Sequence, residues 1–374
     1  MLNERGRDKG ERMGIKFEFL KVYNGDSIYI TTNKTNILID GGTLDTYDDC
    51  ISDIYENLKD DDDANLDLVI LTHIDNDHIQ GLVELLEEEK RAIIEDDDYI
   101  PVIKDIWFNS LIYEKGIFRQ ITKYSYSGAS ELVTFREFIK DIRHKVDFED
   151  YISIDNETLL KKDDIEFILL SPNDDKLKKV CEEHEDKLKY DYASASDDTP
   201  KDYTNLIEEL AKKSFKENGE IRAETGDRTP NNGSSIAFIL TYDDKKYLFL
   251  ADAHMDIVVE SLKKQTQYFN DKGKIEFEFV KLSHHGSKEN LNQHFLNLIE
   301  TDNFIILTNG LSHGHPDDET LSKIIINMER KTEDSVINFI FNYPHMANHS
   351  ELEDIQREKK FKMIYSNVYP LSED

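Results

Sequence analysis

The segment Leu71–His78, Leu-Thr-His-Ile-Asp-Asn-Asp-His, places two histidines and two aspartates directly behind an apolar run. Imidazole and carboxylate groups together suit zinc, manganese or iron. His73 and Asp75 leave one face of an extended backbone because they alternate with other residues. Helical periodicity follows, which places Asp77 and His78 near the first turn of a helix. Such a turn can hold two cations about 3.5 to 4 Å apart, the geometry used for displacement at phosphorus.

Three more apolar runs end in residues that bind metals. These runs end at Asp40, at Asp252 and at the pair His284-His285. Each is typical of a buried strand with a ligand-type residue at its carboxyl end. A single aspartate after a strand is more often a turn former, and Leu71–His78 alone would also fit a solvated acidic turn. The repetition of the pattern favours a metal site.

The order of these motifs resembles the metallo-β-lactamase superfamily, and within it the hydrolase domain of ComEC-type DNA-uptake proteins and their stand-alone relatives. The resemblance runs from about residue 15 to about residue 345, with gaps. It is carried by Tyr23-Asn-Gly-Asp26, Ile39-Asp-Gly-Gly42, Thr72-His-Ile-Asp-Asn-Asp-His78, Asn231-Asn-Gly-Ser234, Leu250-Ala-Asp252, His284-His-Gly-Ser287 and Gly314-His-Pro316. It implies an α/β fold, an αββα sandwich with a dinuclear metal site at one edge of the sheets, and hydrolysis, commonly of phosphodiesters.

The chain departs from the family pattern at three places. Many members carry a histidine where this chain has Asp75, although the ComEC-like branch resembles this chain there. The separate histidine of the Gly-His-Thr-Pro-Gly-His segment has no visible counterpart, and Asn231–Ser234 occupies that stretch of the chain. The Gly-Gln-Gly-Asp pattern is only partly kept as Tyr23–Asp26. These departures leave the number of metals open.

The expected metal ligands are His73, Asp75, Asp77, His78, Asp252 and His284. We expect His73, Asp75 and Asp252 to hold one divalent ion, zinc or manganese, and the remaining three ligands to hold a second ion together with Asp252. Asp252 bridges the two in this prediction because each carboxylate oxygen can bind one cation. Asp77 is also expected to orient the attacking hydroxide.

Two further histidines are expected to act on the substrate. His285 and His315 are candidates to bind a substrate oxygen or to protonate a leaving alkoxide, since imidazole titrates near neutral pH. The alternative for His315 is a turn residue before proline. The segment with Asn231, Asn232 and Ser234 is expected either to contact the substrate or the ligands, or to form an ordinary turn.

Composition restricts the partners. The chain has 374 residues, 46 Lys and Arg against 78 Asp and Glu, and a net charge of −32. This acidity opposes a broad nucleic-acid-binding face, although solubility alone would also explain it. Small anionic substrates are opposed less, because metals supply local positive charge. With no apolar run near 18 residues and two cysteines far apart, we expect a cytoplasmic protein that does not bind membranes.

The expected organisation is a flexible tail over residues 1–13 and one hydrolase domain over 14–374. Residues 174–229 are polar and mostly helical or irregular, which predicts an insertion that caps the site or a surface excursion. Strands are expected at 151–154, 165–170, 236–240, 246–251, 275–282 and 304–308, and helices at 47–58, 254–264 and 289–299.

Three classes of function fit these patterns. The favoured one is a phosphodiesterase or nuclease that uses a dinuclear metal-activated hydroxide on nucleic acid or a nucleotide. The second is hydrolysis of another bond, such as a lactone, thioester or amide, because a fold does not fix the substrate. The third is an effector or interaction protein of a larger assembly, activated by a protein partner.

Overall fold

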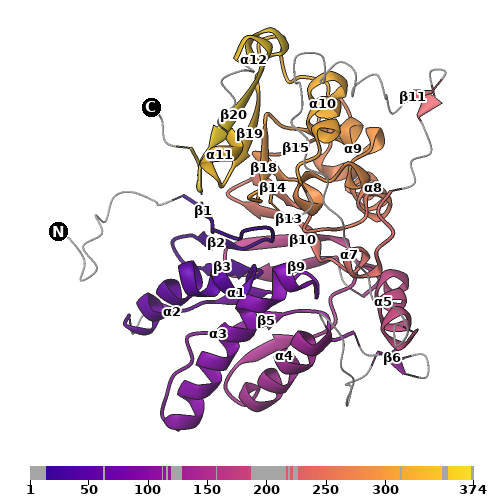
Figure 1. Cartoon of the computed structure of the whole chain (residues 1–374). Helices are drawn as coiled ribbons and strands as arrows, with labels where there is room; N and C mark the ends of the chain where they lie inside the picture. Colours follow the sequence, from indigo (N-terminus) through magenta and orange to yellow (C-terminus); the bar gives the residue numbers. More distant parts are fainter. Residues whose placement is uncertain are drawn as a thin grey trace.

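The structure is a computed structural model, shown in Figure 1. It describes residues 14–61, 64–111, 113–114, 117–118, 129–156, 158–186, 216–217, 220–221, 226–311, 314–347 and 353–371. The expected tail, residues 1–13, lies outside the described residues. Within the described part of the chain, no helix is both long and apolar enough to cross a membrane.

The first half of the chain builds most of a seven-stranded sheet in the order β21-β1-β2-β3-β4-β5-β8. Its strands are β1 (Lys16–Phe19), β2 (Ile28–Thr31), β3 (Asn36–Ile39), β4 (Leu68–Ile70), β5 (Asp105–Trp107), β8 (Asp147–Glu149) and β21 (Val368–Tyr369). From β3 to β8 the strands run parallel, so their carboxyl ends meet at one edge.

The second half builds an eight-stranded sheet in the order β20-β19-β18-β16-β14-β13-β10-β9. Its strands are β9 (Leu159–Lys162), β10 (Ile165–Ser171), β13 (Ala237–Tyr242), β14 (Lys245–Phe249), β16 (Phe279–Lys281), β18 (Asn303–Ile306), β19 (Ile337–Phe341) and β20 (Phe361–Tyr365). From β14 to β20 the strands are parallel. Two-stranded pairs form at β6 (Tyr113–Glu114) and β7 (Ile117–Phe118), at β11 (Lys216–Glu217) and β12 (Glu220–Ile221), and at β15 (Ile275–Glu276) and β17 (Ile299–Glu300).

Helices cover the outer faces of both sheets (Figure 1). The first sheet packs against α2 (Ser52–Lys59), α3 (Asn76–Glu95), α4 (Ala129–Ile142) and α5 (Asp174–Asp186). The second packs against α8 (Met255–Lys264), α9 (Gln293–Leu298) and α10 (Asp318–Asn327). Shorter helices are α1 (Leu44–Thr46), α7 (Pro230–Gly233), α11 (Pro344–Ala347) and α12 (Glu353–Lys359).

Besides the two hydrophobic cores between each sheet and its outer helices, a third hydrophobic core lies between the two sheets. Phe17 of β1 packs against Phe279 of β16 with ring centroids 5.0 Å apart, and Trp107 of β5 packs against Phe167 of β10 at 5.1 Å. Helices, sheet, sheet and helices therefore form four layers. The predicted α/β fold class, an αββα sandwich, is confirmed.

One predicted strand is wrong. Residues 151–154 form no strand, because side chains satisfy their backbone. Asn109 donates to the Ile152 carbonyl and accepts from its N–H. The predicted helix over 254–264 is observed as α8, whereas the one over 289–299 shrinks to α9 after a short 3-10 turn at Lys288–Asn290.

The segment predicted as an insertion is described only at its two ends. α5 packs into the core through Leu177 and Val180, and residues 226–229 lie in an irregular stretch that leads into α7. Residues 187–215, 218–219 and 222–225 lie outside the described residues. The expectation that the segment caps the site therefore stays a prediction.

Candidate metal centre

Four buried strands deliver the candidate ligands. Asp40 follows β3, His73 follows β4, Asp252 follows β14, and His285 follows β16. Carboxyl ends of neighbouring parallel strands lie at the same edge of a sheet. Both sheets therefore direct polar side chains to the same end of the sandwich, where the first group of donor atoms forms.

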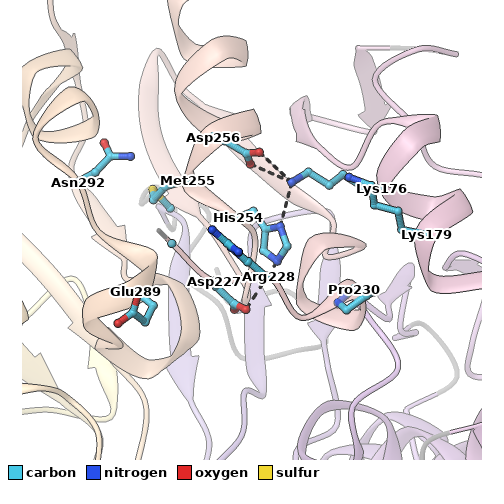
Figure 2. Close-up of a pocket in the computed structure, with 11 residues that line it drawn as sticks. Lys176, Lys179, Asp227, Arg228, Pro230, His254, Met255, Asp256, Glu289 and Asn292 are labelled. Carbon is cyan, nitrogen blue, oxygen red and sulfur yellow. Dashed lines mark hydrogen bonds and ion pairs between the residues drawn. The ribbon is translucent and has the colours of Figure 1, made fainter. Parts of the chain in front are cut away.

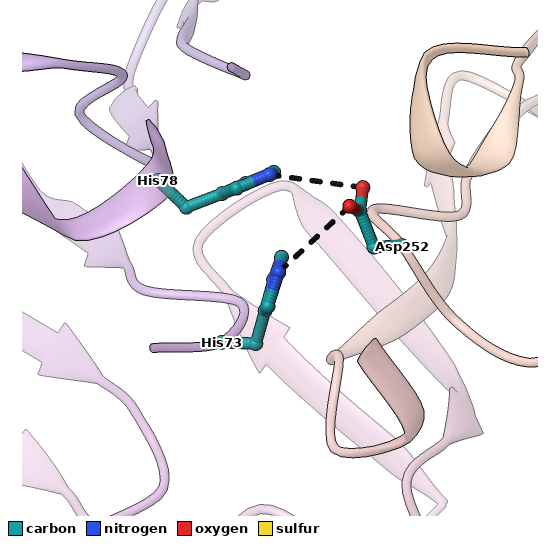
Figure 3. Close-up of side chains that lie close together, drawn as sticks. All are labelled: His73, His78 and Asp252. Atoms are coloured by element: carbon teal, nitrogen blue, oxygen red, sulfur yellow. Dashed lines mark ion pairs between the residues drawn. The ribbon is translucent and has the colours of Figure 1, made fainter. Parts of the chain in front are cut away.

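His73, His78 and Asp252 form the first group of donor atoms, which lie within 4.8 Å of one another. Figure 3 shows the two imidazoles from the first half of the chain pointing at the carboxylate from the second half. Oδ1 of Asp252 lies 3.7 Å from Nε2 of His78, and Oδ2 lies 3.9 Å from Nε2 of His73. The carboxylate thus faces a different histidine with each oxygen.

Asp77, His78 and His285 form a second group within the same 4.8 Å limit. Nε2 of His285 lies 3.8 Å from Oδ2 of Asp77. The sequence predicts His284 as the ligand here, but among the described residues it is His285 that lies with Asp77 and His78. The two groups overlap at His78, so their donor atoms form one continuous cluster.

Hydrogen bonds fix which nitrogen of each histidine faces the site. Nδ1 of His78 donates to Oδ2 of Asp40 at 2.9 Å, and Nδ1 of His285 donates to the Leu307 carbonyl at 2.8 Å. The Thr72 hydroxyl donates to Asp40, so its oxygen accepts from Nδ1 of His73 at 3.1 Å. Each ring therefore keeps its proton on Nδ1 and presents the Nε2 lone pair, as metal-binding histidines do.

The donor atoms fit a metal. Nε2 of His73, His78 and His285 and Oδ1 of Asp252 are all buried without a hydrogen-bond partner among the described residues. A buried polar atom without a partner costs about 1 to 3 kcal/mol, so four in one cluster need a compensating ligand. Nitrogen and carboxylate donors of this kind suit zinc and similar cations.

The charges of the cluster are tightly coupled. Burial opposes ionisation of Asp252, but the surrounding histidines, His284 first, hold its pKa well below the usual range. Burial likewise opposes protonation of His78, but Asp252 and Asp40 raise its pKa well above the ordinary value. Without a metal, His78 therefore also holds a proton on Nε2 next to the Asp252 carboxylate, and a cation that binds there replaces that proton.

A buried ion pair lies beneath the cluster. Nζ of Lys281 on β16 bonds Oδ2 of Asp26, and both side chains are almost fully buried. Oδ1 of Asp26 lies 3.4 Å from Nδ1 of His285. Burial raises the pKa of Asp26, but Lys281 and His285 outweigh it and lower the pKa to about 2. The pair therefore connects the loop after β1 to the histidine-bearing turn after β16.

His284 lies at the open side of the cluster, with 27% of its side chain exposed. Nδ1 lies 3.4 Å from Asp227 and 3.3 Å from Oδ1 of Asn290, and Nε2 lies 3.8 Å from Asp252. Burial opposes its charge, but Asp252 and Asp227 raise the pKa of His284 to about 9. The His315 ring packs on it, with centroids 5.2 Å apart. His284 is thus a protonated group next to the donor atoms.

The remaining predicted residues surround this arrangement. Asp75 lies 3.7 Å from Nε2 of His73 and accepts from the Asn231 amide at 2.7 Å. Asn232 donates to Asp227 at 2.7 Å. Ser234 bonds back to the carbonyl of Asn231 within its own turn and does not point to the cluster.

Asp227 was not predicted from the sequence as a site residue. It lies in the polar segment, where nothing local distinguishes it from other aspartates. Lys281 was also missed, although a lysine within an apolar run that reads as a buried strand is a signal of a buried charge partner.

Comparison with known proteins agrees with the fold. Residues 20–162 match the family model described as the metallo-beta-lactamase superfamily. This part of the chain is thus similar to the superfamily that its motifs predicted, whereas the resemblance to the ComEC-like branch stays a prediction. A metal-dependent hydrolase of the metallo-β-lactamase fold is the function that this match supports. No curated protein matches the chain.

Solved structures resemble the chain only distantly. The metallo-β-lactamase fold protein YhfI from Bacillus subtilis is 10% identical, with a TM-score of 0.40 over 96% of this chain and 99% of that one. A diphosphatase from the PhnP family is 11% identical, with a TM-score of 0.39 over 94% and 95%. The short form of human tRNase Z is 10% identical, with a TM-score of 0.36 over 96% and 100%. Similarity at this level carries no argument about the substrate.

Proposed function

From the match of residues 20–162 to the metallo-β-lactamase superfamily model and from the donor atoms at the strand ends, we propose that the protein is a metal-dependent phosphodiesterase or nuclease. The observation that carries the proposal is the first donor group, in which the two oxygens of Asp252 face His73 and His78, next to the second group of Asp77, His78 and His285. Paired cations on a bridging carboxylate are the arrangement used for in-line displacement at phosphorus. The ligands in this proposal are His73, Asp75, Asp77, His78, Asp252 and, in place of His284, His285.

Divalent cations at this site, zinc or manganese, would supply Lewis acidity and lower the pKa of water. The chain's own groups orient the donor atoms. Asp40 holds the His78 ring, and the Leu307 carbonyl holds His285, so that both Nε2 atoms stay directed at the cluster. The strand ends fix these groups before a substrate arrives, which keeps reorganisation small during the reaction.

His284 has the position and charge of a proton donor. In the protein without metal, Asp252 and Asp227 raise its pKa to about 9; the ring borders the donor atoms and is partly exposed, and Asp227 holds its Nδ1 side. Its Nε2 proton is available to the leaving oxygen of a phosphodiester, a role worth roughly 10² to 10⁴ in rate. His315, which packs against the ring, positions it.

The test is a hydrolysis panel with Mn²⁺- or Zn²⁺-loaded protein. The substrates are single-stranded DNA, duplex DNA, RNA, cyclic dinucleotides, bis-(p-nitrophenyl) phosphate, a lactone and a thioester. We expect turnover of phosphodiesters that Asp252→Asn abolishes and that Asp244→Asn, the same change in an exposed hairpin, preserves. Activity confined to the lactone or thioester would overturn the phosphodiester assignment in favour of the second class.

A second measurement separates the adjacent histidines. We expect His285→Ala to lose metal on elemental analysis, because its Nε2 belongs to the cluster. His284→Ala should keep its metal but hydrolyse an alkyl phosphodiester roughly 10² times more slowly, with a smaller effect on a p-nitrophenyl ester, whose leaving group needs no proton. Metal loss in His284→Ala would reverse the two assignments.

A further inference from the structure

A pocket of about 420 Å³ lies beside the metal centre. Figure 2 shows its walls, formed by α5, by the irregular segment that leads into α7, and by the start of α8. Its polar lining includes Lys176, Lys179, Asp227, Arg228, His254 and Asp256. Nothing in the proposed hydrolytic chemistry uses these residues except Asp227.

Asp227 connects the pocket to the metal centre. One carboxylate oxygen lies 3.4 Å from Nδ1 of His284, and the other lies 3.7 Å from Nε2 of His254. The pocket therefore begins one side chain away from the group that we assign to the leaving oxygen. A substrate held at the metals has its next chemical group within reach of this pocket.

The pocket brings three basic side chains close together in a strongly acidic chain. Lys176, Lys179 and Arg228 line it, although acidic residues outnumber basic ones by 78 to 46 overall. Two of its three carboxylates already have cationic partners, since Asp256 pairs with Lys176 at 2.9 Å and Asp227 pairs with His284. The third, on Glu289, is exposed. The lining thus brings three basic side chains together with three carboxylates, two of which already have cationic partners.

Backbone and side-chain hydrogen bonds orient the donors. His254 donates from Nε2 to the Thr229 carbonyl at 3.0 Å, so its Nδ1 accepts from Lys176 at 2.9 Å and holds the ammonium in place. Met255 and Asp256 form the first turn of α8, whose backbone N–H groups lack acceptors within the helix and favour an anion. The wall thus combines an ammonium held in place by His254 and Asp256 with the backbone amides of the first turn of α8.

We propose that this pocket binds a phosphoryl group of the substrate adjacent to the scissile phosphodiester. The inference rests on the proposed function and narrows it to nucleotides or short oligonucleotides that carry a terminal phosphate. Such a substrate places one phosphodiester at the metals and the terminal phosphate near Lys179 and Arg228. Charge-assisted hydrogen bonds from lysine and arginine are the ordinary means of phosphate recognition.

The first experiment measures binding without catalysis. Pyrophosphate is titrated calorimetrically into metal-free protein, so that metals contribute nothing. Lys179→Glu and Arg228→Glu should each weaken binding about tenfold or more, the usual effect of losing a charged hydrogen bond. The matched control is Lys178→Glu on the same helix, whose ammonium pairs with Glu182 at 3.7 Å and does not line the pocket. Equal losses in all three variants, or no binding by the wild type, would overturn the proposal.

The second experiment compares hydrolysis of the dinucleotides pTpT and TpT by metal-loaded protein. The wild type should prefer the phosphorylated substrate in kcat/KM, and Lys179→Glu should remove the preference, whereas Lys178→Glu should keep it. Equal hydrolysis of the two substrates by the wild type overturns the pocket assignment and leaves the phosphodiesterase standing. Hydrolysis of neither leaves the phosphodiesterase assignment to the substrate panel described above, and the pyrophosphate titration then decides the pocket by itself.

Discussion

At the scale of single residues, the site shows how a buried cluster keeps its donors ready. The three histidines with buried Nε2 atoms each use Nδ1 for a hydrogen bond to a protein oxygen. This choice of tautomer is set by Thr72, Asp40 and the Leu307 carbonyl, and not by the metal. The geometry of the site is therefore specified before metal binding, and two predictions at this scale concern the charges around it.

The buried pair of Lys281 and Asp26 should be needed for stability. Lys281→Met leaves the Asp26 carboxylate buried without its cation, which typically costs 3 to 5 kcal/mol, and urea denaturation should show a loss of about this size. The double variant Asp26→Asn with Lys281→Met removes both charges and should regain most of it. A loss below about 1 kcal/mol in Lys281→Met would show that water or another group compensates the charge.

His284 should make the stability of the metal-free protein depend on pH. Its pKa is about 9 in the folded protein against an ordinary 6.5, so its stabilising effect is complete below pH 6.5 and is lost as pH rises through 9. The free energy of unfolding should be measured for the metal-free wild type and for His284→Gln at pH 6.5 and at pH 9. The difference in free energy between the two proteins should be smaller at pH 9. The control is His294→Gln, an exposed histidine on α9, and an unchanged difference would contradict the shift.

The sequence predicted the chemical types at the site but not their pairing. Ligand-type residues at the ends of apolar runs pointed to the strand ends because that pattern is local. His284 and His285 are equivalent by sequence. Both lie in a tight turn with left-handed backbone, at φ of 47° and 53°, and only the folded turn directs His284 to Asp227 and His285 to Asp77. Asp227 reaches His284 only through the folded chain, so no local pattern marks it.

At the scale of elements, the close contact between the end of β3 and α3 positions His78. The Gly41 N–H donates to the His78 carbonyl at 2.7 Å. A Cβ at Gly81 would lie 2.1 Å from the Gly41 carbonyl oxygen, which requires the neighbouring backbone to move. The helix thus approaches the strand end as closely as it does only because both positions lack a side chain.

Gly81→Ala should therefore destabilise the protein, although alanine normally favours a helix over glycine. Overpacking of this kind typically costs 1 to 3 kcal/mol, and displacement of α3 should also weaken metal binding through His78. Denaturation and metal titration check both effects. Gly14→Ala, where a Cβ meets nothing within 4 Å, is the matched control and should change neither quantity. Unchanged metal affinity in Gly81→Ala would show that the helix tolerates the shift.

Element types were predictable where the apolar pattern was long. Strands after residue 230 and the helix α8 follow the alternation and periodicity of their sequences. The wrong strand at 151–154 has a similar apolar pattern, but Asn109 takes the place of a neighbouring strand. A side chain 43 positions away along the chain cannot be read from a local window.

At the scale of the whole molecule, charge acts in two opposite senses. The net charge of −32 repels a long polyanion, whereas the pocket beside the metals attracts a single phosphate. At 0.1 M salt the Debye length is about 10 Å, and interactions between exposed charges farther apart than this are largely screened. Added salt therefore weakens both effects. The sign of the salt dependence therefore reports which of them governs a given substrate.

We accordingly expect opposite responses from substrates of different length. Raising NaCl from about 20 to 200 mM should increase kcat/KM for a long single-stranded DNA, because encounter between like charges is rate-limiting and salt screens it. The same change should decrease kcat/KM for pTpT, because salt competes with its terminal phosphate for Lys179 and Arg228. Steady-state assays at fixed metal concentration, with potassium acetate as a second salt, check the two slopes. A decrease for the long DNA would mean that a continuous basic track binds it despite the acidic composition, since only phosphate contacts produce that sign.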